Sequence, residues 1–579
     1  MSNKRIIAAM ALAAALSASA EDLKTEITVD RTIVPVEREA TRIGSLTPRL
    51  LSSPVNMRQL SLADYTDPAA ITRSISTLDP AAYADTFALS PYRGYASIGY
   101  FPVFNLGASA GYKFVDNSRT RFGAWLQYDG CIYDPDTDAE AEGRYSSNAV
   151  SVGAALDQRV GAASSFGARL AYTYSAIGLP DAFVNDRQNA NIIDGDLSWW
   201  SRTGLIGYHA KASFSHFSYG KDYRFGAETN APTAKAAGEN RFNINGGISY
   251  FGSSAAPRGG IEIAADFISR SNGVEQIAVA DGPGSFMPRF APIADGTLGV
   301  ISLTPYYAFN SGRIHGRIGA KVEISAGGEG KKFHIAPAVM LDWNVASQFA
   351  VYAQINGGEQ LNSLRSLYEY CPFVGGLWQY QRSHIPVTAD LGINIGPFAG
   401  FSARLFGGYA AANDWLMPQY ASLESKDGNL TFDGCNYGVS DLKGWHGGIG
   451  LSYRWRSAVK ADVSAETASN GSDKAFYLWR DRAKYVIKAS IEVRPLSRLK
   501  LGAGYELRTD RHNYFYDGVF SYAVDLRSVS DLRFEAGYDI SDGLTVFARG
   551  ENLLNRRYDL VSAIRAQGIK GLVGVAYKF

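Results

Sequence analysis

The sequence predicts an all-β protein, namely a transmembrane antiparallel β-barrel of about 20 to 22 strands. Three observations support this fold class. The C-terminal residues alternate between apolar and small or polar side chains, alternating segments follow one another from Tyr95 to the end, and the connections between them alternate in length. Alternation with a period of two indicates strands with two different faces, as in a barrel with lipid outside and water inside.

Composition agrees with this class. The chain has 60 Gly, 34 Tyr and 29 Phe among 579 residues, which suits strands that need aromatic girdles outside and close packing inside. Beyond the N-terminus no apolar run is long enough for a membrane helix, which argues against a helical membrane protein. A large soluble propeller would repeat a motif about every 40 to 50 residues, and none is seen. A net charge of +1 gives no electrostatic reason to expect nucleic acid as a partner.

Residues 1–20 have the pattern of a secretory signal peptide. Lys4 and Arg5 form the charged region, residues 6–16 the apolar core, and residues 18–20 a cleavage site of small side chains. The apolar core is too short to span a bilayer as a helix. We therefore expect the mature chain to begin at Glu21.

Residues 21–90 differ from everything that follows. They carry scattered prolines and short apolar and polar pieces, without sustained alternation. We interpret them as an N-terminal segment that lies in the periplasm or is inserted into the barrel lumen.

Residues 91–579 are expected to form the barrel. Working back from Phe579, the predicted short turns, rich in Gly, Pro, Asn and Ser, fall at residues 541–543, 495–498, 456–458, 396–398, 344–347, 310–312, 253–257, 201–204, 161–164 and 116–118. Most connections on the other side are long, and only those near Pro102 and at residues 326–330 are short. Short periplasmic turns and long surface loops are typical of an outer-membrane barrel. The count reaches about 22 strands, with the hairpin around Pro102 and the piece 196–200 the least secure.

The alternation also assigns the two faces. In the last strand, one set of side chains is apolar and is expected to face lipid: Val573, Val575, Tyr577 and Phe579. In the segment 457–466, one set is polar and is expected to line the lumen: Lys460, Asp462, Ser464 and Glu466. A Lys that faced lipid at the bilayer midplane would cost about 2–4 kcal/mol.

The C-terminal stretch resembles a known family. Glu551-Asn-Leu-Leu-Asn555, Tyr558 and the ending Tyr577-Lys-Phe579 are similar to the end of TonB-dependent outer-membrane receptors. The resemblance implies a barrel in the cell outer membrane, in contact with its lipid, that takes up a nutrient with energy from TonB. The piece Asp30-Arg-Thr-Ile-Val-Pro-Val36 is similar to the TonB-binding motif of that family.

One departure from the family pattern leaves other functions open. The segment 21–90 is about half the length of the plug domain that the family carries. A partner, either TonB or a separate plug protein, is therefore expected, and two alternative functions stand beside uptake: a scaffold or accessory subunit of an outer-membrane complex, or a passive pore.

No motif indicates catalysis or a cofactor, so we expect no enzyme activity, no catalytic residue and no cofactor. The seven histidines form no pair with metal-ligand spacing, and no metal site is predicted: His209, His216, His315, His334, His384, His446 and His512. The run Asp134-Pro-Asp-Thr-Asp138 has the spacing of a calcium loop but lacks its Gly and terminal Glu, which favours a solvated acidic loop.

Two features of the predicted surface loops remain. The loop 358–383 is rich in aromatic residues that suit stacking on a flat ligand, a partner interface or loop packing: Tyr368, Tyr370, Phe373, Trp378 and Tyr380. The three cysteines also fall in or beside such loops. Cys371 and Cys435 lie in loops that follow one another around the rim, so they are the predicted disulfide, with Cys131 left over. No ligand-binding residue can be named.

Overall fold

The structure is a computed structural model. It describes residues 92–579 except 103, 135–143, 162, 180–186, 225–232, 252–256, 283–284, 294–295, 329, 371–381, 425–429, 457, 471–482, 517–520 and 562–563. Residues 1–49 and 50–579 form two units, and every described residue belongs to the second. The predicted signal peptide, the N-terminal segment 21–90 and the TonB-like motif lie outside the described residues and stay predictions.

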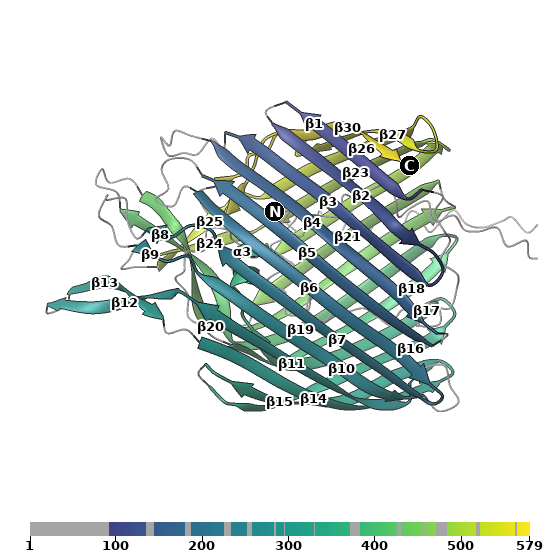
Figure 1. The fold of residues 1–579 in the computed structure, drawn as a ribbon, viewed down its shortest axis with the longest axis horizontal. Coiled ribbons are helices and arrows are strands. Elements are labelled where there is room, and N and C mark those ends of the chain that lie inside the picture. The colour runs from purple at the N-terminus through teal and green to yellow at the C-terminus, as the bar shows by residue number, and fades with distance from the viewer. Residues whose placement is uncertain are drawn as a thin grey trace, which may run out of the picture. The chain divides into compact units, whose positions relative to one another are not determined.

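Twenty-two antiparallel strands form one closed barrel (Figure 1). The first half consists of β1 (Gly94–Phe101), β2 (Asn105–Asp116), β3 (Thr120–Tyr133), β4 (Tyr145–Val160), β5 (Ser164–Gly178), β6 (Arg187–Thr203), β7 (Ile206–Tyr219), β10 (Gly238–Tyr250), β11 (Gly259–Ser271), β14 (Gly296–Ser311) and β15 (Ile314–Ala326). The second half consists of β16 (Phe333–Ala346), β17 (Phe349–Leu361), β18 (Arg382–Phe398), β19 (Phe401–Glu424), β20 (Leu430–Trp455), β21 (Val459–Asn470), β22 (Tyr485–Leu496), β23 (Leu499–Thr509), β26 (Val529–Asp539), β27 (Leu544–Glu551) and β30 (Lys570–Lys578).

The remaining described elements lie in the long connections. They are four short hairpins and one helix: β8 (Tyr223–Arg224) with β9 (Thr233–Ala234), β12 (Gly273–Gly282) with β13 (Ser285–Ile293), β24 (Arg511–Tyr516) with β25 (Ser521–Leu526), β28 (Asp559–Val561) with β29 (Ile564–Arg565), and α3 (Leu364–Tyr370). No helix within the described ranges is long and apolar enough to cross a membrane.

The chain's last residue closes the barrel. β30 pairs with β1 from Tyr95↔Lys578 to Tyr100↔Val573. Beyond the last ladder pair, the Phe579 carbonyl oxygen accepts from the backbone N–H groups of Arg93 and Gly94, at 2.8 and 2.7 Å. Position 94 has to be small, because a Cβ there would lie 2.4 Å from the Phe579 ring. Closure leaves no unpaired strand edge, which a barrel in lipid requires.

The two faces follow the predicted alternation. Val573, Val575 and Tyr577 are 44–55% exposed on the outside, whereas Ala576 between them is 7% exposed. The polar set of β21 faces inward as expected, because Val463 between Asp462 and Ser464 is 45% exposed on the outside. Asp462 lies beside Ser452 and Ser490 across the ladder. The apolar outer surface, with its polar inner counterpart, makes this chain an outer-membrane barrel.

The connections sort as predicted. The ten short turns fall at one end, between β2 and β3 and between each following pair up to β26 and β27, and the long connections fall at the other. The strand count lies at the upper limit of the predicted range. The hairpin around Pro102 forms as β1 and β2, and residues 196–200 are part of β6 rather than a separate strand. We call the end with the short turns periplasmic and the other end extracellular.

A charge on the outer face tests the membrane assignment. Leu170 is 61% exposed near the middle of β5. Leu170→Lys is expected to lower the free energy of unfolding from lipid vesicles by about 2–4 kcal/mol, because the ammonium group loses its hydration. Leu170→Met is the control, and it should change this free energy by less than about 1.5 kcal/mol. Equal stability of the two variants in urea titrations would contradict the lipid-facing assignment.

Candidate functional site: the extracellular end of the lumen

The connection after β17 turns into the lumen instead of standing on the surface. Asn362 and Ser363 are 6% and 3% exposed, and Leu364 at the start of α3 is completely buried. The helix begins with a local cap, because the Ser363 hydroxyl accepts from the Ser366 N–H at 3.0 Å. The carboxylate of Glu239, from β10, accepts from the Leu364 N–H at 2.6 Å. The first turn of α3 is therefore fixed to a strand well separated from β17 around the barrel.

Arg365 connects α3 to two further strands. Its guanidinium pairs with the carboxylate of Asp194 on β6 and donates to the Ser215 hydroxyl on β7 at 2.8 Å. Its Nε also pairs with Glu369 one turn further along the helix, at 2.9 Å. Burial raises the pKa of Glu369, while the nearby Arg365 charge opposes that rise. These contacts hold charged groups in the lumen with their partners.

Tyr368 forms the third attachment and is almost completely buried. Its hydroxyl pairs with the Ser175 hydroxyl on β5 at 3.0 Å, and its ring lies 5.1 Å from that of Phe217 on β7. Burial raises the pKa of the Tyr368 phenol. Of the three alternatives for this aromatic loop, packing is the one that Tyr368 shows, because its ring packs against the inner wall of the barrel.

Together these contacts carry α3 from β17 to β5, β6, β7 and β10 across part of the lumen (Figure 1). Their partners share the inward-facing side of those strands. The loop therefore narrows the extracellular end of the lumen with a segment of the chain itself.

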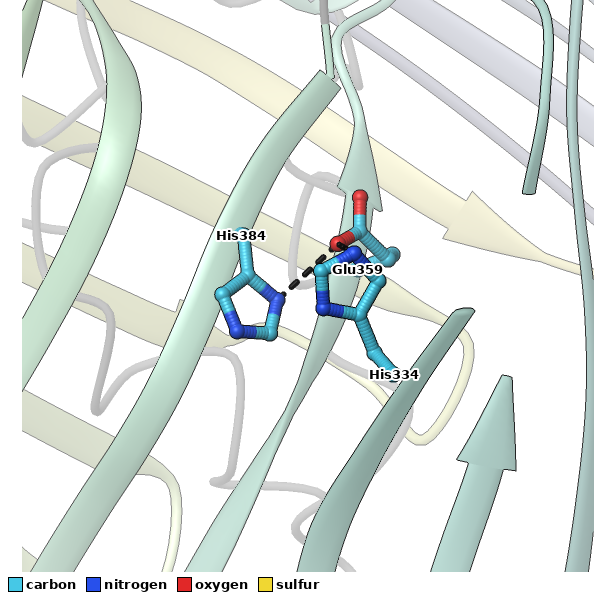
Figure 2. A group of neighbouring side chains, drawn as sticks. All are labelled: His334, Glu359 and His384. Atoms are coloured by element: carbon cyan, nitrogen blue, oxygen red, sulfur yellow. Dashed lines mark ion pairs between the residues drawn. The ribbon is translucent and has the colours of Figure 1, made fainter. Parts of the chain in front are cut away.

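A second cluster lies in the wall beside this loop. Figure 2 shows His334 of β16, Glu359 of β17 and His384 of β18 with their side chains directed at one another. The Glu359 Oε1 lies 3.0 Å from His334 Nε2 and 2.9 Å from His384 Nδ1. The two imidazole rings are 4.1 Å apart between centroids. Within the described part of the chain this is the one group of three ligand-type side chains close enough to share a metal ion.

A bulge places Glu359 in this cluster. Asn356 faces its partner Thr388 on β18, but the register shifts before Gly358, which pairs with Ile385. In a regular strand Asn356 and Glu359, an odd number of residues apart, would face opposite sides. Gly358 has φ +134°, a conformation that favours glycine, and the shift turns Glu359 inward.

The sequence spacing of the histidines, which led to no predicted metal site, gives no sign that His334 and His384 lie together. The two histidines lie far apart in the sequence. Counting alternate residues along a regular strand from Asn356 would place the Glu359 side chain on the outer face of the barrel. The signal available in the sequence was Gly357-Gly358 directly before a glutamate at the end of a strand, because paired glycines in a strand indicate a bulge.

Other predicted residues are not brought together in the described structure. Cys371 lies outside the described residues, and of Cys435 only the backbone, in β20, is described, so the disulfide stays a prediction. Cys131 is buried in β3 with a free thiol. The calcium-like run lies outside the described residues beyond Asp134, as do Phe373, Trp378 and Tyr380.

Solved structures share this architecture. A single-residue variant of the ferric enterobactin receptor PfeA from Pseudomonas aeruginosa matches with a TM-score of 0.60 and 10% identity, over 84% of this chain and 80% of that one. The siderophore receptor PirA from Acinetobacter baumannii matches with a TM-score of 0.59 and 10% identity, over 85% and 81%. The barrel has the fold of the TonB-dependent receptor barrels. No protein-family model and no curated protein matches the sequence.

This likeness confirms the predicted resemblance at the level of the fold. The sequence identity is so low that it shows the fold alone. The substrates in the names of these receptors therefore describe those proteins, and the lumen described above has to be considered on its own residues.

The attachment of α3 can be tested by removing Arg365. Arg365→Ala leaves Asp194 without its guanidinium, and the loss of hydrogen bonds to a charged group should weaken the docked state of α3 by about 1.5–3 kcal/mol. In a chain that lacks residues 21–90, we expect this substitution to raise the single-channel conductance in planar bilayers, because the loop spends more time away from the wall.

Arg202→Ala is the matched control, since Arg202 lies at the periplasmic end of β6 over the ring of Phe251. Its conductance should equal that of the wild type. If Arg365→Ala and Arg202→Ala have the same conductance, α3 is not the segment that restricts the lumen.

Proposed function

We propose that this barrel takes up a nutrient across the outer membrane as a TonB-dependent-receptor-like transporter and catalyses no reaction. The observation that carries the proposal is the closed 22-stranded barrel, which shares its fold with siderophore receptors over 84–85% of the chain. A barrel of this size encloses a wide lumen that has to be filled or gated. Selective uptake uses such a lumen, because the ligand enters while solutes of other kinds are held back.

The inward loop favours this function over a passive pore. Three separate attachments, through Glu239, Asp194 and Ser175, hold α3 against the lumen wall near the extracellular entrance. A segment fixed across the entrance lowers the flux through a pore for free diffusion. A gated transporter gains a partial closure that does not depend on the length of the N-terminal segment.

The residues 21–90 supply the rest of the proposal. We infer that their TonB-like piece, residues 30–36, engages TonB, and that the segment, or a separate plug protein, fills the remaining lumen. Their short length compared with a full plug is the feature that favours the second candidate function, a scaffold or accessory subunit of an outer-membrane complex.

Deleting residues 28–37 separates the two functions. Cells with the deletion variant are expected to lose uptake of the transported compound while the barrel still assembles, because TonB can no longer deliver energy. Uptake would be measured with radiolabelled ferric chelates first and oligosaccharides second, and assembly by surface labelling of the barrel. An in-frame deletion of ten residues within 60–75 is the control.

Conductance measurements test independently whether residues 21–90 fill the lumen. We expect the intact protein to be closed in planar bilayers and a variant without residues 21–90 to conduct, because the segment would leave the lumen. A large conductance of the intact protein would overturn gated uptake in favour of a pore. Unchanged uptake after deletion of residues 28–37 would remove TonB from the mechanism and leave the scaffold.

A further inference from the structure

We propose that His334, Glu359 and His384 form a binding site for a divalent first-row transition-metal ion of the Zn²⁺ type, in the lumen wall at the extracellular end of the barrel. The site is distinct from the α3 attachments and does not depend on whether the barrel transports a nutrient. The proposal rests on the ligand atoms, on their unsatisfied bonding, and on the backbone that positions them.

The three ligand atoms have the spacing of a coordination sphere. His334 Nε2, Glu359 Oε1 and His384 Nδ1 all lie within 4.8 Å of one another, and the two contacts to Oε1 measure 3.0 and 2.9 Å. A metal ion with bonds of about 2.0–2.2 Å keeps neighbouring ligands about 3.0–3.5 Å apart. Small side-chain rotations therefore suffice to admit an ion (Figure 2).

The bonding state of the buried atoms also indicates a ligand. The Glu359 side chain is only 3% exposed. Its Oε1 has ion-pair contacts with the two imidazoles, but neither this oxygen nor His384 Nδ1 makes a hydrogen bond in the structure. A buried polar atom without a partner costs about 1–3 kcal/mol, so such atoms call for an explanation. A shared cation would bind the carboxylate oxygen and both imidazole nitrogens at once. His334 Nε2, which lies 2.9 Å from the Lys331 carbonyl oxygen, would exchange that contact for the ion.

The surrounding backbone holds the carboxylate in place. The bulge at Gly358 turns Glu359 inward, and the Glu359 N–H donates to the Glu323 carboxylate on β15 at 2.7 Å. An added Cβ at Gly358 would lie 2.8 Å from Glu323 Oε1 and 2.9 Å from Lys321 Nζ. A local departure from strand geometry thus serves to place one acidic ligand between two histidines.

Neighbouring charges set the strength of the site. Glu323 Oε1 lies 3.9 Å from Lys321 Nζ, and Glu359 Oε2 lies 3.5 Å from a guanidinium nitrogen of Arg382. With both histidines neutral, these two carboxylates and two cations balance, so a bound divalent ion adds positive charge. We therefore expect reversible binding rather than the very tight binding of a structural zinc site.

The ligand types select the class of ion. Two imidazoles favour Zn²⁺, Ni²⁺, Co²⁺ or Cu²⁺ over Mg²⁺ and Ca²⁺, which prefer oxygen ligands. Three protein ligands leave further positions open for water or for a ligand atom of a bound molecule. The His384 side chain is 22% exposed, although its Nδ1 and the Glu359 Oε1 are themselves buried.

Metal titration of the purified full chain tests the site. The protein would be purified through a tag without histidine, folded in detergent, and titrated with Zn²⁺ by calorimetry and with Co²⁺ by visible absorption. We expect one equivalent bound by the wild type. His334→Gln, Glu359→Gln and His384→Gln should each weaken binding by at least about tenfold, and far-UV circular dichroism would check that each barrel is folded.

His446→Gln is the matched control. His446 also lies in the lumen wall and pairs through Nε2 with the Asp390 carboxylate at 2.7 Å, but it belongs to no three-ligand group in the described part of the chain. Its variant should bind metal as the wild type does. Absence of binding by the wild type, wild-type affinity in all three ligand variants, or an equal loss in His446→Gln would overturn the site.

Discussion

Every part of this structure depends on one constraint, which is that backbone N–H and C=O groups inside a lipid bilayer find partners within the protein. An unpaired group there costs several kcal/mol, so a sheet in a membrane has to close on itself. The ladder between β1 and β30 meets this condition with paired residues from Tyr95 to Tyr100, and the Phe579 carbonyl extends it past the last strand. Closure explains why the alternating pattern continues to the final residue.

Closure of so many strands creates a second problem, the width of the lumen. The chain answers it in part with its own loop, which reaches from β17 to strands several positions away around the sheet. Most of the attachments are polar, which suits a water-lined interior, and Arg365 pairs with both Asp194 and Glu369. A lumen narrowed in this way has a different extracellular entrance from one with all loops on the rim.

Much of the fold could be predicted from the sequence because it depends on local periodicity. The alternation at residues 573–579, the turn residues and the unequal connections follow from rules that act over a few positions. The candidate sites do not depend on local periodicity, because their residues come together from distant parts of the sequence. Loop packing was only one of three alternatives for Tyr368, because its partners, such as Ser175 and Phe217, lie far away in the sequence. Glu359 was hidden by a bulge that reverses parity, and His334 and His384 meet only because β16, β17 and β18 are neighbours.

The pairing of the first barrel strand with the last has a consequence for how the protein is made. Neighbouring hairpins join residues that are close in the sequence. β1 and β30 stand at opposite ends of the barrel sequence, so their pairing has the largest entropic cost of loop closure of any pairing in the sheet. The pairing of β30 with β1 therefore completes the assembly. Until they dock, both edge strands expose bonding groups to other chains. A nascent barrel of this kind needs protection of those two edges, and losing even a few C-terminal residues would leave a complete set of hairpins with an open seam.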